Sequence, residues 1–130
     1  MSQARRYIHR VTIQRQVDEQ DSDGYITKAW ETVILDDETE LYGYPAEVLT
    51  GPGREQHAAG TKLAETTARM NLRWFPGLSP EWRILWPHDG DFDSDGVFSG
   101  KVYDILSIET DRTDRREYRL RCKHGMTDGR

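Results

Sequence analysis

The strict alternation of apolar and polar residues in two C-terminal segments constrains this fold more than any other feature. Residues 66–74 place Thr66, Ala68, Met70, Leu72 and Trp74 on one side of an extended chain. Residues 117–123 repeat the pattern, with inward Tyr118, Leu120 and Cys122 and outward Glu117, Arg119, Arg121 and Lys123. A sheet buried on one face requires this period of two, and no helix satisfies it. The pattern predicts an all-β, antiparallel structure.

The rest of the chain divides into similar short segments separated by turn residues. Strands are predicted over residues 7–17, 25–33, 41–50, 66–74, 82–86, 102–109 and 117–123. In the first, we expect His9, Val11, Ile13 and Val17 to face inward and Arg10, Thr12, Gln14 and Gln16 to face outward. The second should carry Trp30, Val33 and either Tyr25 or Ile26 inward, and the third Tyr42, Tyr44, Ala46 and Val48.

Turn residues support these boundaries. Asp23-Gly24 is a strong hairpin signal, and Pro76-Gly77 suits a type II turn. Pro45 lacks an amide hydrogen and therefore favours a sheet edge or a bulge. Residues 124–130 are expected to form a tail that a partner would have to hold in place.

A long segment, residues 50–65, breaks the alternation. Glycines punctuate it, and residues 54–59 have room for one short helix. Unpatterned segments of this length are unusual inside a small domain and are often functional. On a protein that forms a ring, such a segment would reach the neighbouring copy or the lumen.

Composition limits the possible functions. The 130 residues are enough for one domain, but only 35% are hydrophobic and the mean hydropathy is −0.84, which favours exposed loops or support from neighbouring copies. The net charge of −5 disfavours free binding to nucleic acid. The single cysteine, Cys122, excludes an internal disulfide and is expected to be a small buried residue in a reducing cytoplasm. No apolar run is long enough for a signal peptide or a membrane helix.

The acidic segment 89–96 offers the most suggestive chemistry. Asp91, Asp93, Asp95 and Gly96 match the first half of an EF-hand loop, but Val102 stands where the loop needs a bidentate glutamate. A weak divalent cation site and a solvated acidic hairpin loop are the alternatives, and the turn-forming composition favours the loop. His9, His57, His88 and His124 are not at metal-ligand spacing, and no catalytic motif occurs. We therefore predict no catalytic, cofactor-binding or metal residues.

Three tryptophans surround the Pro-Gly turn, and two lie beside arginines. Arg73-Trp74 and Trp82-Arg83 could stack nucleic-acid bases, whereas indoles at these positions, with Trp86, could instead fill the ends of a small barrel. The negative net charge favours the filling role.

The ordered set of motifs resembles a known family. The matching segments are 9–15, the Asp-Gly hairpin ending at Trp30 and Glu31, 44–48, 53–55 with Ala58 and Ala59, 69–74, 76–80, 102–105 and 120–123. The chain resembles the phage head–tail joining family of long-tailed phages, whose members are also called head-closure, stopper or head–tail adaptor proteins. Two departures stand out: residues 36–44 are longer and more acidic than the family pattern, and residues 87–99 form an acidic insertion.

The resemblance implies a single-domain structure over residues 1–130, a small antiparallel β-barrel of about six or seven strands. It implies a homo-oligomeric ring, a dodecamer or alternatively a hexamer, in the virion neck below the portal and adaptor proteins. This ring would be assembled in the host bacterial cytoplasm and would contact no membrane. It would close the filled head and join tail-completion or tail proteins, while DNA passes through the lumen without sequence-specific binding.

By position, the resemblance assigns residues 50–65 to a gating loop in the DNA channel. The residues expected to act there are Gly51, Gly53, Arg54, Glu55, His57, Gly60 and Lys62. The candidates for docking to the tail or adaptor are Asp89, Asp91, Asp93, Asp95, Arg112 and Arg115. Two alternatives stay open: a tail-terminator or tail-completion protein, and an enzyme that uses the 89–95 loop with a metal ion.

Overall fold

The structure is a computed structural model that describes residues 6–50, 68–110 and 116–124, and these residues form strands and no helix. The seven strands are β1 (His9–Gln20), β2 (Ile26–Thr32), β3 (Tyr44–Thr50), β4 (Ala68–Arg73), β5 (Arg83–Trp86), β6 (Lys101–Thr110) and β7 (Glu117–His124). Their order along the chain follows the predicted segments, so the all-β prediction is confirmed. The short helix expected over 54–59 lies outside the described residues.

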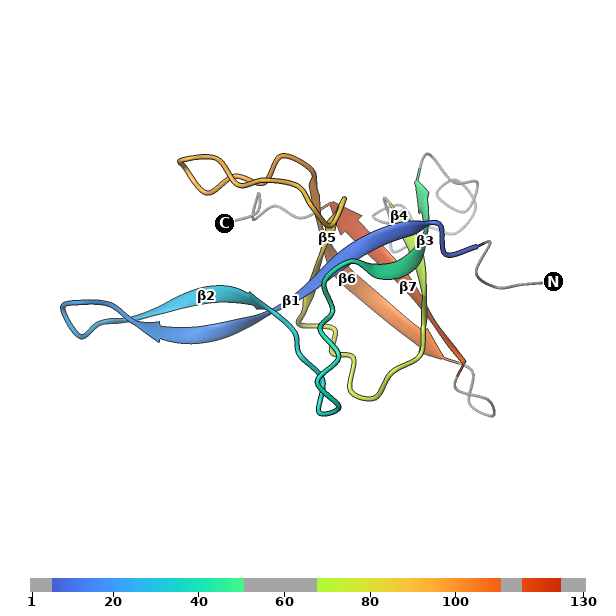
Figure 1. Ribbon diagram of the computed structural model, residues 1–130, viewed down its shortest axis with the longest axis horizontal. Coiled ribbons are helices and arrows are strands. Elements are labelled where there is room, and N and C mark those ends of the chain that lie inside the picture. The colour runs from blue at the N-terminus through green and yellow to red at the C-terminus, as the bar shows by residue number, and fades with distance from the viewer. Residues whose placement is uncertain (1–5, 51–67, 111–115, 125–130) are drawn as a thin grey trace.

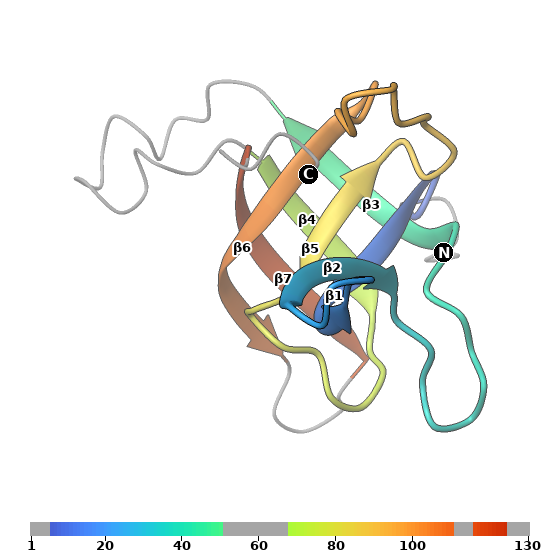
Figure 2. The same ribbon diagram turned by 90° about the vertical axis from the view of Figure 1, so that its left-hand side faces the viewer.

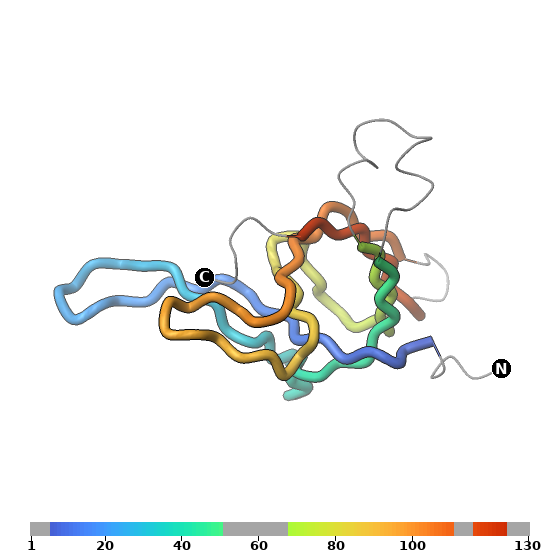
Figure 3. The backbone as a smooth tube through the Cα atoms, turned by 90° about the horizontal axis from the view of Figure 1, so that it is seen from above, coloured from blue at the N-terminus to red at the C-terminus, as the bar shows by residue number. Residues whose placement is uncertain are grey.

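Six of the strands close into an antiparallel barrel. Their order is β1-β3-β4-β7-β6-β5, and β5 pairs back with β1 through Thr12–Leu85, Ile13–Ile84 and Gln14–Arg83. Figures 2 and 3 show the ring of strands from the side and from above. Closure leaves the paired parts of these strands without a free edge, which removes the usual route to uncontrolled sheet association.

The barrel interior is built from the alternating residues. Ala68, Met70 and Leu72 of β4 face Leu120 and Cys122 of β7, and all five are buried in one apolar cluster. Trp74, Trp82 and Trp86 are partly buried against this cluster, as the barrel-filling interpretation requires. The inward assignments made for β4 and β7 are therefore confirmed where the structure describes them; Thr66 lies outside the described residues.

The extra strand, β2, forms a hairpin with the second half of β1 and projects from the barrel (Figure 1). Only the first half of β1 belongs to the barrel wall, pairing with β3 over His9–Val11 and with β5 over Thr12–Gln14. The prediction that Tyr25 or Ile26 faces inward is wrong, because their side chains are 71% and 70% exposed. At that point the hairpin has left the barrel and no longer has a core to cover.

Three polar or aromatic positions also differ from the prediction. Thr12 and Gln14 were expected outside but are buried, because the Thr12 hydroxyl donates to the His88 carbonyl and Gln14 accepts from the Arg83 guanidinium. Tyr42 was expected inside but is 52% exposed, and its neighbour Leu41 is buried instead. The predicted alternation is thus shifted by one residue just before β3 begins.

Within the described residues, no helix is long and apolar enough to span a membrane.

Candidate docking surfaces

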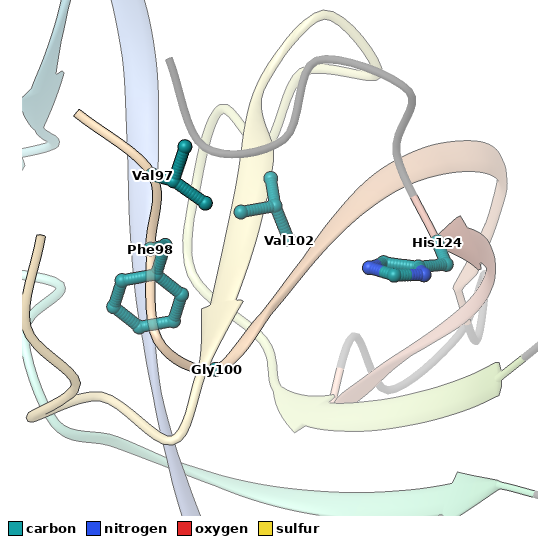
Figure 4. Close-up of a pocket in the computed structure, with 5 residues that line it drawn as sticks. All are labelled: Val97, Phe98, Gly100, Val102 and His124. Atoms are coloured by element: carbon teal, nitrogen blue, oxygen red, sulfur yellow. The ribbon is translucent and has the colours of Figure 1, made fainter. Parts of the chain in front are cut away.

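The described part of the chain holds no cluster of three or more histidine, cysteine or acidic side chains placed to bind a metal ion. Its hollows are small and open. One, of about 240 Å³, is lined by Val97, Phe98, Gly100, Val102 and His124 (Figure 4). Among the described residues of its lining, one side chain is titratable: His124, whose ring centre lies 6.0 Å from that of Tyr103. Such a hollow can receive an apolar side chain from a partner, and its described lining offers no pair of groups for acid–base chemistry.

The acidic loop 87–99 projects from the side of the barrel from which the β1–β2 hairpin also extends (Figures 1 and 3). A bridge between Phe92 and Phe98 holds it together. The Asp93 carboxylate accepts hydrogen bonds from the amides of Asp95 and Val97, at 2.8 and 3.0 Å. This carboxylate therefore shapes the turn, as the hairpin-loop interpretation expects.

The predicted docking residues are only partly described. Asp89, Asp91, Asp93 and Asp95 are all exposed on this loop, so they can meet a partner. Arg112 and Arg115 lie outside the described residues, and so do all the gating-loop candidates: Gly51, Gly53, Arg54, Glu55, His57, Gly60 and Lys62. Thr50 pairs with Ala68, so the chain leaves β3 and enters β4 at the same point on the barrel. The gating assignment stays a prediction.

The tip of the β1–β2 hairpin is a well-organised turn. The Asp21 carboxylate accepts from the amides of Asp23 and Tyr25, both at 2.9 Å, and the Asp21 amide donates to the Tyr25 carbonyl at 2.9 Å. Gly24 has a φ of +89°, a conformation that side-chain-bearing residues adopt at a cost. These bonds fix the backbone of the turn that carries the exposed Tyr25. The sequence identified the turn but not that it stands away from the barrel.

A buried arginine joins this hairpin to the barrel. The Arg83 guanidinium, on β5, lies 4.2 Å from the centre of the Trp30 ring on β2, and its Nε donates to Gln14 Oε1 on β1 at 2.8 Å. Burial lowers the pKa of Arg83 to about 10, against the opposing effect of Asp104, so the group stays charged at neutral pH. Sequence reasoning missed this contact because Trp30 is far from Arg83 along the chain.

Another buried ionic cluster lies beside the first residue of β1. Glu117 is only 7% exposed, so the prediction that it faces outward is wrong. It accepts a 2.6 Å hydrogen bond from the Tyr7 hydroxyl and pairs with Arg6 at 2.8 Å. Arg6 also pairs with Glu47 at 2.9 Å, and Asn71 donates to the same Glu47 oxygen at 2.7 Å.

This cluster shifts the pKa values of its members. Burial, together with the hydrogen bond to Glu117, raises the pKa of Tyr7 to about 12. Burial alone would raise the pKa of Glu47, but hydrogen bonds from Asn71 and Arg6 hold it below its usual value. The cluster therefore keeps the Tyr7 phenol neutral and the Glu47 carboxylate ionised at neutral pH.

A basic hollow of about 250 Å³ adjoins this cluster and is lined by Tyr7, Arg10, Pro45 and Arg73. Arg10 donates to the Gly43 carbonyl at 3.0 Å, and the Arg73 guanidinium lies 5.7 Å from the centre of the Tyr7 ring. In the described part of the chain, neither arginine forms an ion pair with a carboxylate. The hollow therefore presents positive charge around an aromatic floor.

The fold of the chain is similar to that of a solved protein. The solution structure of protein SF1141 from Shigella flexneri 2a shares 25% identity with it at a TM-score of 0.61, over 93% of this chain and 95% of that one. No curated protein matches the sequence. A family model of phage head completion proteins matches residues 3–125, which include every described strand. The resemblance found in the sequence is thereby confirmed, and the chain belongs to the phage head completion protein family.

Proposed function

We propose that copies of this chain assemble into a ring in the phage neck, where the ring closes the DNA-filled head and joins it to the tail. The family match carries the proposal, because it spans the barrel together with both projections. The exposed Tyr25 and Ile26 on the hairpin tip support it, because an isolated chain has no core at that point to bury them.

The proposed mechanism is assembly, not catalysis. Repeating one head-to-tail contact around an axis closes a ring when the rotation between copies divides a full turn. The portal and adaptor proteins would bind one face of the ring, and tail-completion or tail proteins would bind the other. DNA would pass through the lumen, and the net charge of −5 would limit its adhesion to the ring.

The segment 50–65 is proposed to line the lumen and retain the packaged DNA. Its length and glycines, and the joining of its two ends at the Thr50–Ala68 pair, support this role. Deletion of residues 54–60 should give particles that package DNA and then leak it. Unchanged melting and unchanged incorporation into particles would show that the shortened chain still folds and assembles. Normal DNA retention in such particles would reject gating by this segment.

The neck assignment is tested by removing the gene from the phage or prophage that encodes it. DNA-filled heads that fail to join tails are expected, and added purified protein should restore joining. The purified protein should also bind isolated connector rings, and electron microscopy of restored particles should place it between head and tail. Binding to tail tubes alone would instead identify a tail-terminator protein.

A further inference from the structure

We propose that the hairpin tip of one copy, residues 19–26, docks into the basic hollow of the next copy, formed by Tyr7, Arg10, Pro45 and Arg73. This inference rests on the proposed ring and supplies its contact between subunits. The two surfaces lie at opposite ends of the same strand, β1 (Figure 1).

Their separation requires a second copy. Twelve residues of β1 at about 3.3 Å each span roughly 40 Å. The tip therefore cannot fold back onto the hollow of its own chain while β1 stays paired in the barrel and in the hairpin. A contact between the two surfaces is necessarily intermolecular and head-to-tail, the type that closes rings.

The tip supplies negative charge and an aromatic side chain. Glu19, Asp21 and Asp23 are exposed, and no cation pairs with them in the described part of the chain. Lys28, the nearby cation on β2, already pairs with Asp18. The exposed Tyr25 and Ile26 add an aromatic and an aliphatic side chain to this acidic tip.

The hollow supplies the complement. Arg10 and Arg73 provide positive charge, and the Tyr7 ring and Pro45 provide an apolar floor. Its volume of about 250 Å³ is below the roughly 300 Å³ at which small-molecule pockets begin, and it suits one large side chain such as Tyr25. The Arg73 guanidinium, which lies over the Tyr7 ring, can also stack with a second aromatic ring on its other face.

Charge selects the direction of assembly. Two tips would bring carboxylates together, and two hollows would bring guanidinium groups together, so both symmetric pairings are repulsive. Only the tip-to-hollow pairing joins opposite charges. The charges thus favour the heterologous contact between copies. They disfavour an isologous dimer, which would occupy the surfaces that further copies need.

Disulfide trapping tests the pairing directly. Asp23→Cys is placed in one preparation and Arg10→Cys in another, both exposed positions, while the native Cys122 is 0% exposed and cannot compete. Mixing the two under mild oxidation at low salt should give a cross-linked dimer, and each preparation alone should stay uncross-linked. A dimer from Asp23→Cys alone would show tip-to-tip association and overturn the proposal.

Charge reversal provides a matched second test in the same chain. Asp23→Arg and Arg73→Glu should each weaken self-association by about tenfold or more in sedimentation experiments, and the combined variant should recover most of the loss. Equal losses that simply add in the combined variant would contradict direct pairing. Melting curves of all three variants distinguish lost docking from lost folding.

The assembled particle separates failure of this inference from failure of the proposed function. The chain carrying both cysteine substitutions is incorporated into particles and oxidised, and a ladder of cross-linked copies is expected. Protein present in the neck without any cross-link would reject the tip-to-hollow contact and leave the neck role standing, with the tip binding another virion protein. Protein absent from DNA-filled, tailed particles would reject the neck role itself.

Discussion

The hydrogen bond between Tyr7 and Glu117 gives a sharp test of the buried ionic cluster. Tyr7→Phe removes one hydroxyl and leaves the ring in place. In the native protein, that hydroxyl donates a 2.6 Å bond to a carboxylate that is only 7% exposed. Glu117 would keep its contacts with Arg6 and Arg119, at 2.8 and 3.3 Å, so the carboxylate would not be left without partners.

The expected cost follows from the type of bond. A buried hydrogen bond to a charged group contributes about 1.5–3 kcal/mol to stability. At about 2.1 cal/mol/K of unfolding entropy per residue, a chain of 130 residues loses roughly 4 °C of Tm for each kcal/mol. Tyr7→Phe should therefore lower the Tm at pH 7 by roughly 5–11 °C. Tyr42→Phe is the matched control, because Tyr42 is half exposed, and it should change stability by less than about 0.5 kcal/mol.

The pH dependence has a definite sign. Folding raises the pKa of Tyr7 from 10.0 to about 12, so the fold favours the protonated phenol. The resulting stabilisation is complete below pH 10 and is lost as the pH rises from 10 towards 12. Urea unfolding followed by circular dichroism should show the native protein losing stability more steeply than Tyr7→Phe over that interval. A variant within 0.5 kcal/mol of the native protein at pH 7, or a gap that widens above pH 10, would refute this account of the cluster.

Three further outcomes are expected. Leu72→Ala, at a fully buried position of β4, should cost about 2–5 kcal/mol in urea unfolding, and a loss below 1 kcal/mol would contradict the closed core. Burial raises the pKa of Cys122 to about 12, so its thiol should react with a disulfide reagent at pH 8 at least about a hundredfold faster in denaturant than in the native state; similar rates would contradict its burial. Arg83→Met should remove the contacts to Gln14 and Trp30 and speed amide exchange in β2 by about tenfold or more, whereas unchanged exchange would show that the hairpin needs no such anchor.

The sequence predicted the strands well because alternation is a local signal. Met70, Leu72, Leu120 and Cys122 were assigned inward from a period of two, and all four line the barrel interior. Alternation distinguishes the two faces of one strand, but it does not show whether another part of the chain covers the polar face. Gln14 was therefore misplaced, since its cover comes from Arg83 on the adjacent strand β5, which lies far away along the chain.

The ends of strands were harder to predict for a related reason. Tyr25 and Ile26 continue the apolar pattern of a buried hairpin, but β1 is longer than the barrel wall that it joins. Beyond Arg15 its only partner among the described strands is β2, so most side chains of that hairpin meet solvent. The prediction for Glu117 was wrong for the opposite reason. Its partners, Tyr7 and Arg6, come from the other end of the chain and bury a position that the alternation predicts to be exposed.

Net charge alone gives an incomplete description of the protein surface. A total of −5 argues against binding free DNA, but it conceals a strong separation of charge along β1. Arg10 and Asp21 are eleven positions apart, which in a helix would be about 16 Å and in an extended strand is roughly 36 Å. The strand conformation thus converts a short alternation of basic and acidic sequence into two opposite poles of the molecule. Because opposite charges attract and like charges repel, the geometry of this one strand supplies the polarity that the proposed ring requires.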